Sequence, residues 1–512
     1  MTDAQTVADV MNPDPVTGHP SETISTVAER MDGAGVGAVV VIDDTRRPIG
    51  ILTERDLVRF AASGADTSTA KLSEWMTEDP DTVGTGVTVA DAFHSLVSAR
   101  YRHIPVVDGG ALVGIVSLRR LTNLAQLEPV EHPGHLEAPK GLEGVVVAAT
   151  TVGDVRGQEG FYHYRQYSAT ELAEKRSIED VWHLMFLGEL PTPAEGEAFS
   201  AEVNRLRVVP PEVAEVLPAV ARASDPFVPL DALRTAVSLL AQARGFRPWL
   251  DTDIDTLRAE AMHVCAVIPT LIMALHRLSE GEEPVEPDDE LGYAANYLYM
   301  LTGNRPPAEH ARAIEQYLIT TVDHGFNAST FTARVVTSTG ADLGAAVVAA
   351  IGALSGPLHG GAPSRALGML DEIQTPDRAE AWVRSAVERG DRIMGFGHRV
   401  YKTDDPRSVM LRSVAERLGG PRVELARAVE RTVIDTLAEL KPGRQLYTNV
   451  EFYAGVVMEE VGLPADLFTP TFASSRTIGW CANILEQAAD NRLIRPSADY
   501  VGPPPPQPVP EA

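Results

Sequence analysis

Apolar residues in the first 128 positions recur with helical and strand-like periods, and the whole arrangement occurs twice. A helical i, i+3, i+4, i+7 spacing starts at Ile24 and again at Val89, an offset of 65 residues. Each predicted helix is followed by two short apolar runs typical of strands, at 39–43 and 49–53 and then at 104–108 and 113–117. Because each copy is too small to close a core alone, we predict an α/β pair with pseudo-symmetry, with copies at 1–65 and 66–128.

The pattern changes after residue 128. Residues 129–140 are rich in proline, glycine and charge, which indicates a linker. Longer helical stretches such as 177–187 and 291–301 follow, and strand-like runs are scarce, so residues 141–502 are predicted to be mainly α. Residues 503–512 form a proline-rich tail of a composition typical of disorder. The predicted chain is therefore multidomain.

Composition and charge narrow the classes of partner. The chain is 44% hydrophobic and 22% charged, as in ordinary globular proteins, and its net charge of −27 disfavours nucleic acid and anionic membranes as partners. The longest apolar run, 345–354, is about half of the ~20 residues that a membrane span needs. The first residues lack the basic and apolar regions of a signal peptide, and Cys265 and Cys481 lie far apart in sequence. We therefore expect a cytoplasmic protein with reduced thiols.

Four segments in the second half place a histidine or a glutamate beside glycine, asparagine and arginine residues. Singly, each such residue is more often structural than catalytic, and it is their joint occurrence that indicates a site. His359 follows an apolar helix and precedes one that we expect to begin at Pro363, whose dipole should lower the histidine pKa and keep the ring neutral. The segments are DHGFNAST (323–330), GPLHGGAP (356–363), GFGHRVYKTDDPR (395–407) and NVEFYAG (449–455), the last followed by FASSRTIGW (472–480) and RLIRPSADYVG (492–502).

These segments resemble the signature blocks of the citrate synthase family. GPLHGG, GFGHRVYK with DPR, and NVEFY through FASSRTIGW occur in the family's order, and DHGFNASTF is similar to a fourth block. GLEGVVVAATTVGDV (141–155) resembles the family's N-terminal region. The resemblance covers about residues 141–502. It implies a citrate-synthase-like fold with a large helical domain and a smaller one, at about 361–462, that closes over the substrates.

The resemblance also implies a reaction, the condensation of acetyl-CoA with oxaloacetate to citrate and free CoA. A carboxylate base must remove a proton from the acyl methyl group while a donor stabilises the enolate oxygen. Glu451 matches the family's base, and His359 matches its enol-stabilising residue. His398 matches the residue that polarises and protonates the 2-oxo carbonyl oxygen. We thus expect an acyltransferase with His359, His398 and Glu451 as catalytic residues.

The remaining matches concern binding. His324, Arg407 and Arg476 match the residues that contact the dicarboxylate, for which guanidinium groups are suited by bidentate pairing. Lys402 matches a basic residue near the CoA phosphates. Arg495 matches a residue that the family supplies from the neighbouring subunit, which implies a homodimer or a higher homo-oligomer.

The sequence departs from the family pattern at three positions. Relatives usually carry an aspartate as the base, and Glu451 is one methylene longer. Gly325 stands where many relatives have an acidic residue, and Thr321 where many have a histidine. Two alternative functions follow: a 2-methylcitrate synthase that uses propionyl-CoA, because one methylene gives only ~1–3 kcal/mol of discrimination, and a nucleotide-binding regulatory protein on a degenerate synthase scaffold.

The repeated N-terminal units resemble a tandem pair of CBS domains, through VMNPDPVT, GILTERDL, WMTEDPDTV and RHIPVVD with GIVSLRRL. In that family a T-x-x-D motif binds the ribose of adenosine, and Thr53 and Asp56 match it in the first copy. The second copy has Ser117 and Arg120 and lacks the carboxylate. One adenine nucleotide site, with a regulatory role, is therefore expected, and the alternative is a pair that serves only as an oligomerisation scaffold.

No metal site and no resident cofactor are predicted, since acyl-CoA is a substrate. HPGH (132–135) has the spacing of metal ligands but lies in the proline- and glycine-rich linker without cysteine or helical support. GAGVGAV (33–39) follows a predicted helix and precedes a strand, which is the wrong order for a dinucleotide-binding turn.

Overall fold

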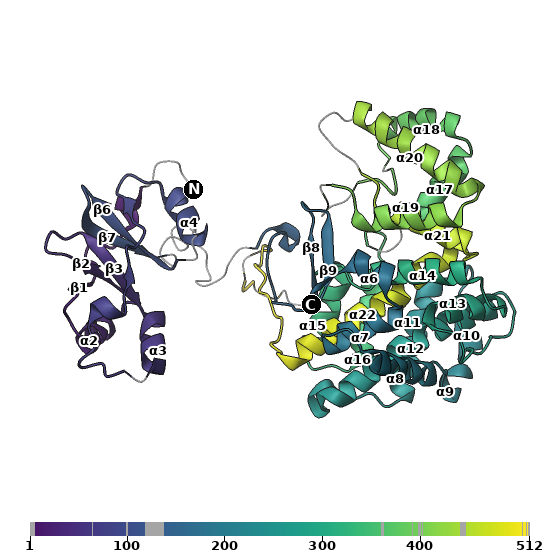
Figure 1. Ribbon diagram of the computed structural model, residues 1–512, viewed down its shortest axis with the longest axis horizontal. Helices are drawn as coiled ribbons and strands as arrows, with labels where there is room; N and C mark the ends of the chain where they lie inside the picture. The colour runs from purple at the N-terminus through teal and green to yellow at the C-terminus, as the bar shows by residue number, and fades with distance from the viewer. Residues whose placement is uncertain are drawn as a thin grey trace. The chain divides into compact units, whose positions relative to one another are not determined.

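The chain divides into two compact units, Met1–Glu143 and Gly144–Ala512, each with hydrophobic clusters of its own (Figure 1). The computed structural model describes residues 6–63, 65–98, 101–117, 138–359, 363–391, 393–397, 401, 403–440, 447–503, 505–507 and 509. The predicted linker, 129–140, falls at this division, and its positions up to 137 lie outside the described residues. The first unit is α/β and the second mainly α, as the sequence predicted.

Both predicted repeats are present in the first unit. Its elements are α1 (Val7–Val10), β1 (Thr17–Gly18), α2 (Ile24–Ala34), β2 (Ala38–Ile42), β3 (Pro48–Thr53), α3 (Glu54–Ser63), η1 (Leu72–Glu74), β4 (Thr77–Glu78), β5 (Val83–Gly84), α4 (Val89–Ser98), β6 (His103–Asp108), β7 (Ala111–Ser117) and η2 (Lys140–Leu142). The antiparallel pair β2–β3 is matched by β6–β7, and each gains a short parallel strand, β1 or β5. The register shifts between Val41 and Ile42 in one copy and between Val106 and Val107 in the other, which are equivalent positions.

The two copies exchange short segments. Val7 and Val10, at the start of the first copy, are buried in the cluster of the second copy with Val89 and Leu96. Leu72, which precedes the second copy's helix, is buried in the cluster of the first. Neither copy therefore completes its core from its own repeat, which is the physical reason for the predicted pairing.

The second unit is built mainly of helices around one core. Its elements are β8 (Gly153–Arg156), β9 (Phe161–Tyr164), β10 (Tyr167–Ser168), α6 (Ala169–Lys175), α7 (Ile178–Leu187), α8 (Pro193–Leu206), α9 (Pro211–Ala214), α10 (Leu217–Ala221), α11 (Pro229–Ala243), η3 (Trp249–Asp251), α12 (Ile254–Ser279), α13 (Tyr293–Thr302), α14 (Ala308–Thr321), α15 (Ala328–Ser338), α16 (Leu343–Leu354), α17 (Pro363–Ile373), α18 (Pro376–Glu388), α19 (Pro406–Leu418), α20 (Pro421–Leu440), α21 (Val450–Glu460), η4 (Ala465–Leu467) and α22 (Phe468–Ala489).

Two long helices, α12 and α22, pack against each other in this core. By length and composition alone α12 could cross a membrane, but 89% of its apolar window is buried among other helices. It is therefore a core helix. Cys265 of α12 and Cys481 of α22 are both free and buried.

The helices α17 to α20 gather in one part of the second unit, and Figure 1 shows them beside the larger group that contains α7 to α16. The smaller domain predicted at about 361–462 spans these helices and α21. Its closure over substrates stays a prediction. The helix α14 packs against α19, α21 and α22, so residues of these three helices lie near it.

Candidate active site

The loop that leads to Glu451 pairs with another predicted site segment. Segments 395–397 and 447–449 form a short antiparallel ladder, in which the Gly397 amide donates across at 2.7 Å and the Asn449 amide donates back at 2.9 Å. The Asn449 side chain accepts from the Glu451 amide at 3.0 Å, and Glu451 lies in the first turn of α21. The ladder therefore fixes the glutamate beside the glycine-rich segment that ends at position 397.

The Glu451 carboxyl group is partly buried between charged neighbours. Its removal from water raises its pKa from 4.5 to about 7, while Arg407 lowers the pKa and Asp405 raises it. The N-terminus of α21 favours the carboxylate form, yet burial has the larger effect. The carboxyl group therefore titrates near neutral pH, which suits a general base.

Asp405 holds Arg407 next to Glu451. Its carboxylate accepts from Arg407 Nε at 3.0 Å and Nη2 at 2.8 Å, and both side chains are almost completely buried. The amide of Val450, the first residue of α21, donates to the same carboxylate at 3.2 Å. Burial disfavours the charge on Arg407, but Asp405 outweighs it and raises the pKa of Arg407 overall. This buried pair therefore ties the arginine to the helix of the candidate base.

His359 is held in one tautomer by Ser329. The Ser329 amide donates to His359 Nε2 at 3.3 Å, and the Ser329 hydroxyl lies 2.8 Å from the same atom. Because a backbone amide can only donate, Nε2 is the acceptor and the ring proton is on Nδ1. Trp480 Nε1 donates to the serine hydroxyl at 3.1 Å and fixes its position.

The pKa of His359 is lowered to about 4, first by burial and then by the charge of Arg476. The direction matches the prediction from the sequence. Burial and the charge of Arg476 lower the pKa, and a contribution from the dipole of the helix that begins at Pro363 stays a prediction. His359 is therefore a neutral donor through Nδ1–H at physiological pH.

Arg476 is buried beside a second acidic group. Its Nε donates to the Thr321 carbonyl at 2.8 Å, and its guanidinium lies over the Phe472 ring at 4.4 Å. Burial lowers the pKa of Arg476, and the charge of Asp323 raises it. In turn, burial raises the pKa of Asp323 to about 6, and Arg476 opposes this. Thr321, which stands where many relatives have a histidine, thus holds the arginine through its backbone.

His324 and Arg407 meet at Tyr401. The Tyr401 hydroxyl lies 2.9 Å from His324 Nε2, and the Arg407 guanidinium lies 5.8 Å from the centre of the tyrosine ring. The centre of the Tyr162 ring lies 5.6 Å from the centre of the His324 ring. The structure therefore brings His324 and Arg407 to the same tyrosine, and Arg407 is in electrostatic contact with Glu451 and Arg476.

Three predicted residues are not placed with this group. Arg495 lies in the exposed segment after α22. His398 and Lys402 lie outside the described residues, so their assigned roles stay predictions. Among the residues that the structure describes, no group of three or more His, Cys, Asp or Glu side chains is arranged to hold a metal ion.

Sequence reasoning missed Ser329, Asp405 and Tyr401, although each lies within or beside a quoted motif. Asp405 carried a usable signal, since it stands two residues before Arg407 and a carboxylate so close to an arginine favours an ion pair. Ser329 and Tyr401 had none, because their partners come from distant segments.

In the first unit, Thr53 and Asp56 contact each other directly. The Thr53 amide and hydroxyl donate to Asp56 Oδ2 at 3.0 and 2.7 Å, and Asp56 Oδ1 lies 3.2 Å from Arg59 Nη2. This arrangement is that of a helix cap at the start of α3. Ser117 ends β7, and Arg120 lies outside the described residues.

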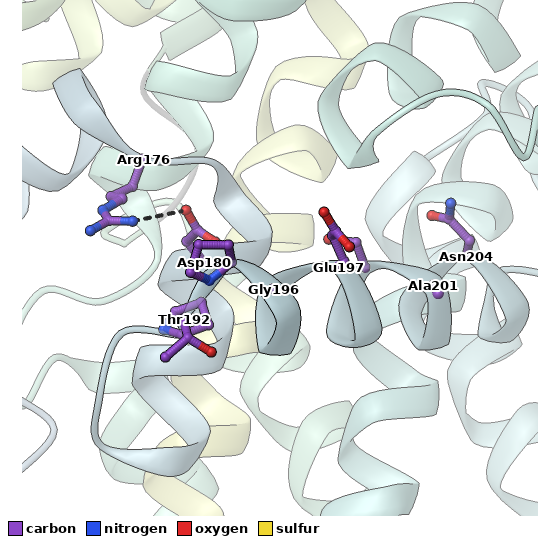
Figure 2. A pocket seen from close by; sticks show the side chains of 10 residues that line it. Arg176, Asp180, Thr192, Gly196, Glu197, Ala201 and Asn204 are labelled. Carbon is purple, nitrogen blue, oxygen red and sulfur yellow. Dashed lines mark ion pairs between the residues drawn. The ribbon is translucent and has the colours of Figure 1, made fainter.

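A pocket of about 540 Å³ lies elsewhere, between α7 and α8 (Figure 2). It shares no lining residue with the group described above. An ion pair between Arg176 and Asp180, at 3.8 Å, borders it. Its lining is Arg176, Asp180, Pro191, Thr192, Pro193, Gly196, Glu197, Ser200, Ala201 and Asn204.

Comparison with known proteins gives a consistent assignment. Residues 141–497 match the family of the citrate synthase C-terminal domain, and residues 7–63 and 72–126 match the CBS domain family. A citrate synthase of Deinococcus radiodurans is 39% identical over 372 residues, which cover 71% of this chain and 95% of that protein. A 2-methylcitrate synthase of Mycobacterium tuberculosis is 40% identical over 363 residues, which cover 71% and 90%.

Solved structures agree. A citrate synthase of Thermoplasma acidophilum, in a ternary complex with carboxymethyl coenzyme A and oxaloacetate, matches with a TM-score of 0.68 and 31% identity over 73% of this chain and 98% of that one. A citrate synthase of Thermotoga maritima matches with a TM-score of 0.64 and 35% identity over 72% and 98%. The chain therefore belongs to the citrate synthase family, whose members are acyltransferase-type enzymes, and it carries a tandem pair of CBS domains ahead of the synthase region.

Proposed function

We propose that this protein condenses acetyl-CoA with oxaloacetate to give citrate and free CoA. The observation that supports this most is the pairing of a carboxyl group that titrates near pH 7, Glu451, with a neutral histidine donor, His359. Enolisation of a thioester requires such a base and such a donor at once. The charge of Arg476 acts on His359 and that of Arg407 on Glu451, so the groups share one electrostatic environment.

In the proposed mechanism the Glu451 carboxylate takes a proton from the acyl methyl group. The electron pair of the broken C–H bond moves into the enolate, whose oxygen accepts a hydrogen bond from His359 Nδ1–H. The enolate carbon then attacks the 2-oxo carbon of oxaloacetate, and His398 is proposed to protonate the resulting alkoxide. Water finally cleaves the thioester C–S bond and releases the CoA thiol.

Binding of the dicarboxylate is assigned to His324, Arg407 and Arg476. Asp405 already accepts two hydrogen bonds from Arg407, so the arginine is oriented before the substrate arrives. The Thr321 carbonyl orients Arg476 in the same way. Lys402 is proposed to contact the CoA phosphates.

The first test is thiol release with oxaloacetate and either acetyl-CoA or propionyl-CoA. We expect release with acetyl-CoA, and loss of about 10³-fold or more in kcat for Glu451→Gln, because the amide cannot accept the proton. Faster release with propionyl-CoA would favour the 2-methylcitrate synthase alternative.

The variant Glu451→Asp is the matched control for the degenerate-scaffold alternative. If the native protein is slow and the aspartate restores a large rate, the glutamate marks a degenerate site. A native protein that releases no thiol with either acyl-CoA, although folded, contradicts the proposed function.

A second prediction concerns pH. As a base, Glu451 must be deprotonated, so kcat/KM for acetyl-CoA should be half-maximal near pH 7, level off at higher pH and approach a tenfold fall per unit at lower pH. His359, with a pKa of about 4, should not titrate in this window. Steady-state rates from pH 5 to 9 check this, and a midpoint near the ordinary glutamate value of 4.5 would contradict it.

We also propose a homodimer in which each site receives Arg495 from the other subunit. The exposed position of Arg495 supports this, as does a partly exposed face of small apolar residues on α16, which in a single chain lacks full cover. That face is Ala345, Val348, Ala349, Gly352 and Ala353.

Hybrid dimers test this arrangement. Co-expressed Glu451→Gln and Arg495→Ala chains, each of low activity alone, should regain about a quarter of native activity, because half the dimers are mixed and each mixed dimer has one intact site. Mixtures that stay as inactive as the parents would contradict the shared site.

Regulation by an adenine nucleotide at the CBS pair is the last part of the proposal. Among the residues that the structure describes, Asp56 Oδ1 pairs with Arg59 Nη2 at 3.2 Å, and a carboxylate oxygen can also accept from a ribose hydroxyl. The free, buried thiols of Cys265 and Cys481 fit the cytoplasmic location that we propose.

We expect ATP, ADP or AMP to raise the melting temperature, and Asp56→Ala to abolish the shift. Asp91→Ala is the control, because Asp91 makes the same kind of cap with Thr88 in the second copy and both variants lose a cap worth about 1 kcal/mol. Only Asp56→Ala should lose the nucleotide response. The absence of a shift with all three nucleotides refutes the site.

A further inference from the structure

One buried phenol near the candidate site lacks a hydrogen-bond partner. Tyr317 lies on α14 and its side chain is completely buried. Within the part of the chain that the structure describes, its hydroxyl makes no hydrogen bond. A buried polar group without a partner costs stability, so such a group in a native fold calls for an explanation.

The other fully buried tyrosines of this core differ from Tyr317 in that their hydroxyls are hydrogen-bonded. Each of them finds an acceptor or a hydroxyl partner nearby, as buried tyrosines usually do. The hydroxyls of Tyr162, Tyr164 and Tyr293 donate to backbone carbonyls, that of Tyr297 pairs with Thr471, and that of Tyr453 donates to Glu430. Tyr317 is therefore the exception among the six fully buried tyrosines of this set.

The surroundings of Tyr317 are those of the active site. Its helix, α14, packs against the helices that carry Arg407, Glu451 and Arg476. Its backbone carbonyl accepts from the Thr321 hydroxyl at 3.0 Å, and the Thr321 carbonyl holds Arg476. Burial raises the pKa of Tyr317, and the charges of Arg476, Glu451 and Arg407 each act on it.

Of these three charged groups only one can accept a hydrogen bond from a phenol. Guanidinium groups have donors alone, whereas an ionised carboxylate only accepts. The Glu451 carboxylate receives no hydrogen bond from a described side chain. It is also one methylene longer than the aspartate of relatives, so its position needs a further constraint.

We propose that Tyr317 is a positioning residue for Glu451. When the substrates fill the site, the Tyr317 hydroxyl donates a hydrogen bond to the Glu451 carboxylate, holds the long side chain towards the acyl methyl group and favours the ionised form. This inference rests on the proposed function, since it takes Glu451 as the base. Without substrates the hydroxyl makes no hydrogen bond to any residue that the structure describes.

The variant Tyr317→Phe removes only the hydroxyl. We expect the midpoint of the kcat–pH profile to rise by about one unit, because the lost hydrogen bond favoured the carboxylate, and kcat at about pH 5, below both midpoints, to fall about tenfold. The KM values for both substrates should be unchanged. The melting temperature without substrates should be equal or higher, because the hydroxyl makes no hydrogen bond there.

Tyr297→Phe is the matched control, since it removes an equally buried phenol that is bonded to Thr471. It should lower the melting temperature and leave the pH midpoint in place. An unchanged pH midpoint in Tyr317→Phe overturns the inference, as does an effect confined to KM, which would assign the hydroxyl to the substrate. The pH midpoint and the KM values can be measured only if the native protein releases thiol. A failure of the proposed function would therefore appear in the native protein, and a failure of this inference only in Tyr317→Phe.

Discussion

The proposed chemistry of the candidate site depends on the burial of one carboxyl group, that of Glu451. Burial raises its pKa to about 7, and the neighbouring Asp405–Arg407 pair adds one charge of each sign. Were Arg407 present alone, its charge would hold the carboxylate ionised and weakly basic. With Asp405 as its partner, the arginine keeps a fixed orientation while its effect on the glutamate pKa is opposed.

The fold supplies this environment from segments far apart in the chain. The ladder between 395–397 and 447–449 sets the start of α21, and α14, which packs against α21 and α22, holds Arg476 through the Thr321 carbonyl. Ser329 and Trp480 then fix the tautomer of His359. The proposed base, Glu451, and the proposed donor, His359, thus depend on different helices, and a movement between these helices would change the distance between the two side chains.

Local sequence was informative where contacts are local. The repeat of the first unit was predictable because its period, strand lengths and even the position of the register shift recur at one offset. The exchange of Val7 and Leu72 between the copies could not be predicted. Both copies have apolar cores, so the hydrophobic pattern is satisfied whichever core each residue joins. In the second unit the motifs identified His359 and Glu451, but the lowered pKa of His359 comes first from burial and then from the charge of Arg476, and both depend on packing. Likewise, nothing in the sequence shows that the Tyr317 hydroxyl is unpaired.

The central claim is that burial places the ionisation of Glu451 near neutral pH. Its most direct measurement is a carbon-13 NMR titration of the labelled glutamate carboxyl groups in the native protein, with the Glu451 signal assigned by its absence in Glu451→Gln. The account predicts a midpoint of about 7 for that signal. A midpoint near 4.5, the ordinary value for a glutamate, would contradict it.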